Sequence, residues 1–110
     1  MEFNEYQKKA LTTKVVNPDP AMDKTILAMG IAGEAGEVIE KWKKIVVYKD
    51  AKITRSDLEE LKKELGDVVW YIAVLADSLG LTFEEVMQHN IRKLADRNKR
   101  GVIKGKGDNR

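Results

Sequence analysis

Apolar side chains recur every three or four positions along four segments of the chain, the spacing that places them on one face of an α-helix. The first segment is short and stops before Pro18 and Pro20, because proline does not fit inside a helix. Asp23 is the predicted N-cap of a long second helix. The expected core positions of these two helices are Phe3, Tyr6, Ala10 and Leu11, followed by Leu27, Ile31, Val38, Trp42 and Ile45.

Two capping boxes, in which a Ser or Thr is followed three positions later by Glu, predict where the next helices begin. Ser56 with Glu59 opens a third helix, Thr82 with Glu85 opens a fourth, and Gly80 is the expected end of the third. The apolar positions of the third helix are Leu58, Leu61, Leu65, Val68, Ile72, Leu75 and Leu79. Those of the fourth are Phe83, Val86, Met87, Leu94 and Ala95.

The second half of the third helix is apolar on all sides, so it requires neighbours in several directions. A monomer of 110 residues buries only about two thirds of its unfolded surface, and self-association would add to that burial. The sequence therefore predicts an all-α, four-helix-bundle-type domain over residues 1–100 that is completed by homo-oligomerisation. Residues 101–110 include three glycines and show no helical period, and we expect them to form a flexible basic tail.

Composition narrows the class of protein. Hydrophobic residues make up 43% and charged residues 35% of the chain, which is typical of a folded domain. There are no cysteines, no apolar run long enough to cross a membrane and no signal peptide, so we expect a cytoplasmic protein without a membrane partner. Eight Lys or Arg against two Asp lie between Ile91 and Arg110, which leaves the rest of the chain acidic.

Four carboxylates have the same relation to the apolar stripes of the second and third helices. Glu34 lies about 40° and Glu37 about 100° around the helix from Val38, and Glu64 and Asp67 have the same angles to Val68. The surrounding phrases, E-A-G-E-V-I and E-L-G-D-V-V, form a weak internal repeat. The glycines in these phrases, Gly36 and Gly66, indicate either a close backbone approach or room for a ligand.

Carboxylates on a core stripe cost free energy unless they are paired or bind a cation, and four of them together would repel one another. Oxygen ligands suit Mg²⁺, or Mn²⁺ in its place, better than zinc. The sequence therefore predicts a divalent metal site formed by Glu34, Glu37, Glu64 and Asp67. The alternatives are neutral buried glutamates, salt bridges to Lys, and a solvated acidic face.

These motifs resemble those of the MazG-like nucleotide pyrophosphohydrolases, which belong to the all-α NTP pyrophosphatase superfamily. The resemblance rests on E-x-x-E at Glu34 and E-x-x-D at Glu64, on the phrases around them, and on N-x-x-K-L-x-x-R beginning at Asn90. It covers residues 3–97. Some members carry a further Glu that can act as a base directly after the first motif Glu, and this chain has Ala35 there.

The resemblance implies a Mg²⁺-dependent hydrolase that cleaves an NTP or dNTP between its α and β phosphates, giving the monophosphate and pyrophosphate. It also implies a MazG-like helical fold completed as a homodimer or homotetramer. The four carboxylates would be the metal ligands and the catalytic residues, and Asn90, Lys93 and Arg97 would bind the triphosphate. Tyr6 and Gln7 would help to close a pocket for the base.

Two other classes of protein fit parts of the sequence. A di-iron carboxylate bundle requires Glu-x-x-His on two helices, and no histidine lies three residues after a motif glutamate. The second is a non-enzymatic helical oligomeric interaction module whose basic tail binds nucleic acid. No aromatic residue is interleaved with the cations of that tail, so such binding would be sensitive to salt and independent of sequence. Nucleic acid is therefore not the expected partner.

Overall fold

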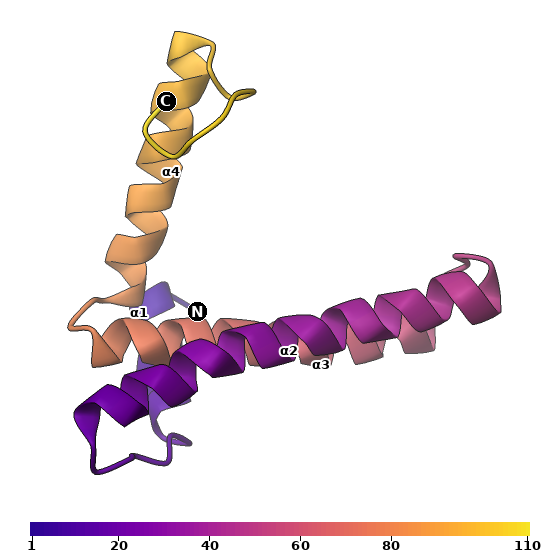
Figure 1. The fold of residues 1–110 in the computed structure, drawn as a ribbon, viewed down its shortest axis with the longest axis horizontal. Coiled ribbons are helices and arrows are strands. Elements are labelled where there is room, and N and C mark those ends of the chain that lie inside the picture. Colours follow the sequence, from indigo (N-terminus) through magenta and orange to yellow (C-terminus); the bar gives the residue numbers. More distant parts are fainter.

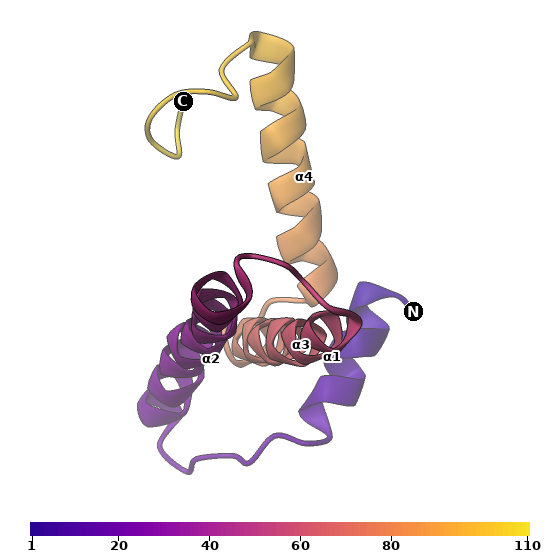
Figure 2. The same ribbon diagram turned by 90° about the vertical axis from the view of Figure 1, so that its right-hand side faces the viewer.

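The computed structural model describes residues 1–110 and contains four α-helices and no β-strand, which confirms the all-α prediction. Helices α2 and α3 form a long pair that lies side by side in both views, and the chain reverses direction between them (Figures 1 and 2). The short α1 packs against α3, whereas α4 leaves the end of α3 at an angle of 105°. The helices are α1 Phe3–Leu11, α2 Pro20–Lys49, α3 Arg55–Ser78 and α4 Phe83–Arg100.

The start of α2 differs from the prediction. Its N-cap is Asp19, whose side chain accepts hydrogen bonds from the backbone N–H groups of Ala21 and Met22. Pro20 occupies the first helical position, where the absence of an N–H group costs nothing. Asp23, the predicted N-cap, instead lies buried inside the first turn, where it accepts hydrogen bonds from Lys14 Nζ at 2.8 Å and from the backbone of Asn17 at 3.0 Å.

The start of α3 is also shifted. Thr54 is the N-cap and forms the capping box with Asp57, so the predicted box of Ser56 and Glu59 is wrong by two residues. Asp57 is further held by a hydrogen bond from Lys49 Nζ at the end of α2, at 2.7 Å. The predicted box of Thr82 and Glu85 is confirmed at the start of α4.

Side chains from α1 hold the first turn of α4 in place. Gln7 Oε1 accepts a hydrogen bond from the backbone N–H of Phe83 at 3.1 Å, and Asn4 Oδ1 accepts one from that of Glu84 at 2.9 Å. Gln7 Nε2 donates to the carbonyl oxygens of Ala73 and Leu81. Because Gln7 is buried and all these contacts are internal, its predicted role in a base pocket is not supported by the structure.

The core is small and lies where α1, α2 and α3 meet. Its buried members are Ala10, Leu27 and Val74, and Trp70 packs against them. The indole N–H of Trp70 donates to the carbonyl oxygen of Ala10 and to Thr13 Oγ1, so this residue joins α3 to the end of α1. Trp42, which the periodicity places in the core, is 42% exposed.

One glycine of α2 is required by the contact with α3. A Cβ atom added to Gly30 would lie 2.2 Å from the ring of Tyr71, so a side chain there would require this ring or the backbone around it to move. Gly36 and Gly66, the glycines of the repeated phrases, have open space around them. The close-approach interpretation of these two glycines is therefore wrong within a single chain.

Residues 101–110 contain turns but no helix or strand, and they fold back along α4 (Figure 2). Gly101 ends α4 with a positive φ of 72°. The guanidinium of Arg110 donates to the carbonyl oxygens of Val102, Ile103 and Gly107, which closes the segment on itself. No single helix is long and apolar enough to cross a membrane. The bent pair α3 and α4 has sufficient length and apolar character only when the two helices are counted together.

Candidate metal centre

The pairing of α2 with α3 brings together three of the four predicted carboxylates. Glu34 projects from the middle of α2, and Glu64 and Asp67 project from α3 one turn apart. One oxygen from each of these side chains lies within 4.8 Å of the others. Glu34 and Glu64 are half-buried and Asp67 is exposed, so the group is accessible to solvent on one side.

Electrostatic repulsion is evident at Glu34. Partial burial raises the pKa of this carboxyl group above its ordinary value, and the negative charges of Asp67, Glu64 and Glu37 raise it further. Partial burial raises the pKa of the Tyr6 phenol on α1, and the negative charge of Asp67 raises it further. A cation between these carboxylates would relieve the repulsion.

Glu37 is exposed and does not belong to the group of three. It lies near the edge of the site, because its charge still contributes to the raised pKa of Glu34. Glu37 lies about 60° around α2 from Glu34, the same angle that separates Asp67 from Glu64 on α3, so helical phase alone does not distinguish the two residues.

The group fits a hard divalent cation. Its donors are all carboxylate oxygens, from two helices that hold them at close range, and Mg²⁺ and Mn²⁺ prefer such ligands. The group contains neither histidine nor cysteine, which argues against a zinc site. Glu34, Glu64 and Asp67 are therefore the residues that would hold the ion, with Glu37 at its margin.

The residue that the sequence analysis missed at this site is Lys41. Its Nζ lies 3.6 Å from Glu64 Oε1 and 3.3 Å from Glu60 Oε2, so it bridges one carboxylate of the group to a neighbour one turn away on α3. These contacts, chiefly the hydrogen bond with Glu60, raise the pKa of Lys41. The spacing of the sequence could have identified Lys41, because it follows Glu37 by four positions and Glu34 by seven and therefore lies on the same face of α2.

The predicted triphosphate-binding residues lie on α4, which contacts α1 and α3 but not α2. Asn90 is exposed, Lys93 is half-buried and Arg97 is only 4% exposed. Arg97 donates a hydrogen bond to the backbone carbonyl of Asp108, whose carboxylate lies 3.7 Å from Arg97 and 3.8 Å from Lys93. Figure 1 shows α4 leaving the α2–α3 pair, so one chain does not bring these cations over the carboxylates.

Comparison with known proteins identifies the domain. Residues 23–102 match the family model described as the MazG nucleotide pyrophosphohydrolase domain. This chain belongs to the MazG family. It is 50% identical over 84 residues to the Gene 37 protein of Mycobacterium phage L5, an alignment that covers 76% of this chain and 74% of the phage protein. No solved structure matches the chain.

Family membership confirms the resemblance found in the sequence, and it covers every residue of the carboxylate group. The match to the MazG domain model begins at residue 23, in the first turn of α2, and includes all of α3 and α4 but not α1. The site and the predicted phosphate-binding residues therefore lie inside the matched region, and the residues that support α4 from α1 lie outside it.

Proposed function

We propose that this MazG-family protein hydrolyses nucleoside triphosphates between the α and β phosphates, releasing pyrophosphate and a nucleoside monophosphate, with Mg²⁺ as the cofactor. The observation that carries the proposal is the group of Glu34, Glu64 and Asp67 in a domain of the MazG family. Bound Mg²⁺ supplies Lewis-acid catalysis at the phosphate oxygens. The substrate is an NTP or dNTP.

In this proposal the carboxylates hold the cofactor and Glu37 completes the set from the edge of the site. Partial burial of Glu34 and Glu64 orients them, because half-buried side chains have fewer rotamers available than exposed ones. Lys93 and Arg97 bind the triphosphate together with Asn90, and the planar guanidinium of Arg97 suits bidentate contact with a phosphate. Both cations already form ion pairs with the carboxylate of Asp108, which is consistent with binding of an anionic ligand between them.

We further propose that the protein acts as a homo-oligomer. Its accessible surface is 8180 Å², about 2,000 Å² more than the roughly 6,200 Å² of a compact monomer of this mass. The radius of gyration is 16.9 Å, compared with about 13 Å for a compact domain of this length. The excess on one chain is more than twice the roughly 800 Å² that each partner buries in a standard protein interface.

The outer side of α2 supplies an apolar surface for that association. Six apolar residues follow one another there at intervals of four, three, four, three and four, the heptad spacing of a helix that packs against another helix. All of them are exposed except Ala35, which is half-buried. We call them the outer stripe: Ala28, Ala32, Ala35, Ile39, Trp42 and Val46.

The proposed activity is tested by incubating the protein with Mg²⁺ and a panel of NTPs and dNTPs and measuring pyrophosphate and orthophosphate separately. Pyrophosphate release from at least one nucleotide is expected. Glu64→Gln should reduce it by about 100-fold or more, since loss of a group that merely supports a metal ligand already costs about 10- to 100-fold. Glu59→Gln is the matched control, because Glu59 lies on the same helix and pairs only with Lys62.

Two results would count against the proposal. Release of orthophosphate alone would place the protein in another class of hydrolase. Absence of turnover with every nucleotide would favour the interaction module, which salt-sensitive binding to a DNA duplex would then support.

A further inference from the structure

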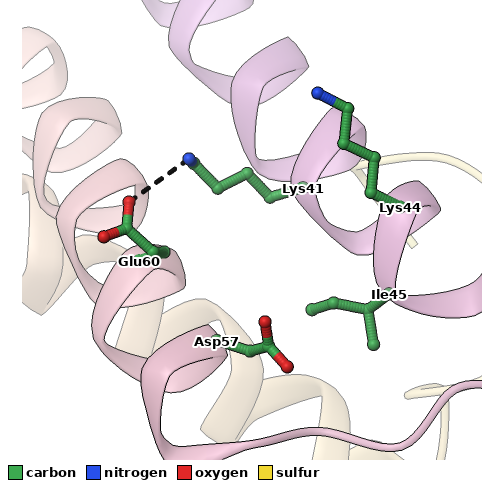
Figure 3. A pocket seen from close by; sticks show the side chains of 5 residues that line it. All are labelled: Lys41, Lys44, Ile45, Asp57 and Glu60. Atoms are coloured by element: carbon green, nitrogen blue, oxygen red, sulfur yellow. Dashed lines mark hydrogen bonds and ion pairs between the residues drawn. The ribbon is translucent and has the colours of Figure 1, made fainter. Parts of the chain in front are cut away.

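Lys41 is the cation that contacts the carboxylate group within the chain. Of the ion pairs in the structure, only the one between Lys41 and Glu64 involves a member of the group of three. The Lys41 side chain crosses from α2 toward α3, as Figure 3 shows for its contact with Glu60. It is one third exposed, so its ammonium group is accessible from solvent.

The space beside Lys41 is a groove between α2 and α3. Its volume is about 180 Å³, room for about six water molecules, and it is lined by Lys41, Lys44, Ile45, Asp57 and Glu60 (Figure 3). The two acidic residues of the groove have other cationic partners. Asp57 pairs with Lys49 at 2.7 Å, and Glu60 pairs with Lys63 at 3.0 Å.

These pairings leave Lys41 free to change partner at little electrostatic cost. If Lys41 left both carboxylates, Glu60 would keep its contact with Lys63. Glu64 would lose its only cationic partner in the chain, but a divalent cation bound by the group would replace it. Such a cation and the Lys41 ammonium repel each other, so binding of the cation favours movement of Lys41 to an anion.

We propose that Lys41 is a substrate-binding residue that exchanges Glu64 for a phosphate oxygen of the diphosphate part of the substrate when the carboxylates bind their cation. The inference rests on the proposed function and deepens it, because it assigns the groove between α2 and α3 to the pyrophosphate side of the triphosphate. Lys41 then has two opposite effects. It competes with the cation when no phosphate is bound, and it stabilises phosphate once the cation is present.

The test measures these two effects separately in the full-length protein, without turnover. Mn²⁺ binding in the absence of nucleotide is measured by electron paramagnetic resonance, and binding of inorganic pyrophosphate in the presence of Mg²⁺ is measured by calorimetry. Lys41→Gln should tighten Mn²⁺ binding about tenfold and weaken pyrophosphate binding about tenfold. This is the scale, about 1.4 kcal/mol, expected of one unit charge in a largely solvated site.

Lys41→Arg should restore both affinities to within about threefold of wild type, because it keeps the charge. The matched control is Lys43→Gln, which removes an exposed lysine of the same helix that pairs with Glu40 only and should change neither affinity. Weakening of both affinities by Lys41→Gln would show that Lys41 merely supports the helix pair and would overturn the proposal. Unchanged pyrophosphate binding would also overturn it.

Failure of the proposed function is distinguishable from failure of this inference. The first would be seen in the wild-type protein, as absence of turnover and of Mn²⁺ binding. The second would be seen only in the comparison of the Lys41 variants with a wild-type protein that binds both probes.

Discussion

Replacement of Gln7 by Leu tests how α4 is held. Leu has nearly the volume of Gln, so the change removes hydrogen bonds without creating a large cavity. Gln7 makes three of them, with lengths of 2.9, 3.1 and 3.1 Å to Ala73, Leu81 and Phe83. At about 1 kcal/mol for each bond, the free energy of unfolding should fall by about 3 kcal/mol. The buried N–H of Phe83 would lose the side-chain acceptor that caps the first turn of α4.

Urea denaturation followed by circular dichroism measures this loss. With a slope of about 1.5 kcal/mol per M for a chain of this size, the midpoint should fall by about 2 M. Wild type and variant are compared at the same protein concentration, since self-association would make stability depend on concentration. The control Gln88→Leu removes an exposed glutamine that bonds only to Glu84 at 3.0 Å, and should change stability by less than about 0.5 kcal/mol. A Gln7→Leu variant as stable as the control would refute the structural role assigned to Gln7.

Three further changes test the helix pair and its charges. Gly30→Ala should lower the melting temperature, because the added methyl group meets the ring of Tyr71. Gly66→Ala adds a methyl group in open space and should leave the melting temperature unchanged or raise it. Thermal denaturation of both variants tests this, and a Gly30→Ala variant as stable as wild type would contradict the close contact. Contacts with Lys49 and Thr54 lower the pKa of Asp57 from 3.8 to about 2, so its stabilising effect should be complete above about pH 4 and lost as the pH falls through 2. Asp57→Asn should therefore melt below wild type at pH 7 and together with it below pH 2, and a constant difference across this range would be inconsistent with the lowered pKa. Glu34 has a raised pKa, so its ionised form destabilises the metal-free protein at neutral pH. Glu34→Gln should raise the melting temperature at pH 7 in the absence of metal. In wild type, Mg²⁺ at 100 times its dissociation constant should add about 2.7 kcal/mol to the free energy of unfolding, and the variant should not gain this stabilisation. Equal stabilisation of both proteins by Mg²⁺ would argue against Glu34 as a ligand.

Sequence periodicity predicted the helices well because each amphipathic pattern is local. The ends of the helices were harder to predict, since overlapping candidates for a cap satisfy the same rule. Asp19 and Asp23 are both acceptable N-caps, and the structure uses Asp19 because Pro20 follows it. Thr54 with Asp57 and Ser56 with Glu59 both place an acidic residue three positions after a hydroxyl residue, and the structure uses the first pair, in which Asp57 also contacts Lys49. This choice depends on tertiary structure, which a local pattern does not contain.

The candidate site was predictable to the extent that it depends on helical phase. Glu34 and Glu64 lie close to Val38 and Val68 on their helices, and the pairing of α2 with α3 brings their carboxylates together. Glu37 has the same phase as Asp67 but is exposed and stays outside the group, so helical phase alone did not identify which carboxylates meet. Trp42, which was expected in the core, is exposed for a related reason: the periodicity identifies an apolar face but not the neighbour that covers it.

The position of α4 is the main feature that spacing could not predict. Its direction is fixed by the bend of 105° after α3 and by capping groups from α1, and both are tertiary features. The bend separates the carboxylates on α2 and α3 from Lys93 and Arg97 on α4. A triphosphate held by both sets of residues therefore requires either a rotation of α4 or a second copy of the chain. Rotation would break the contacts of Gln7 and Asn4 with the first turn of α4, whereas association would cover the outer stripe and much of the excess surface. These terms favour the proposed homo-oligomer, with a site completed by a second subunit. Light scattering of an Ile39→Asp variant, with a charged group in the middle of the stripe, should show a loss of assembly, and the pyrophosphate assay should show a loss of activity.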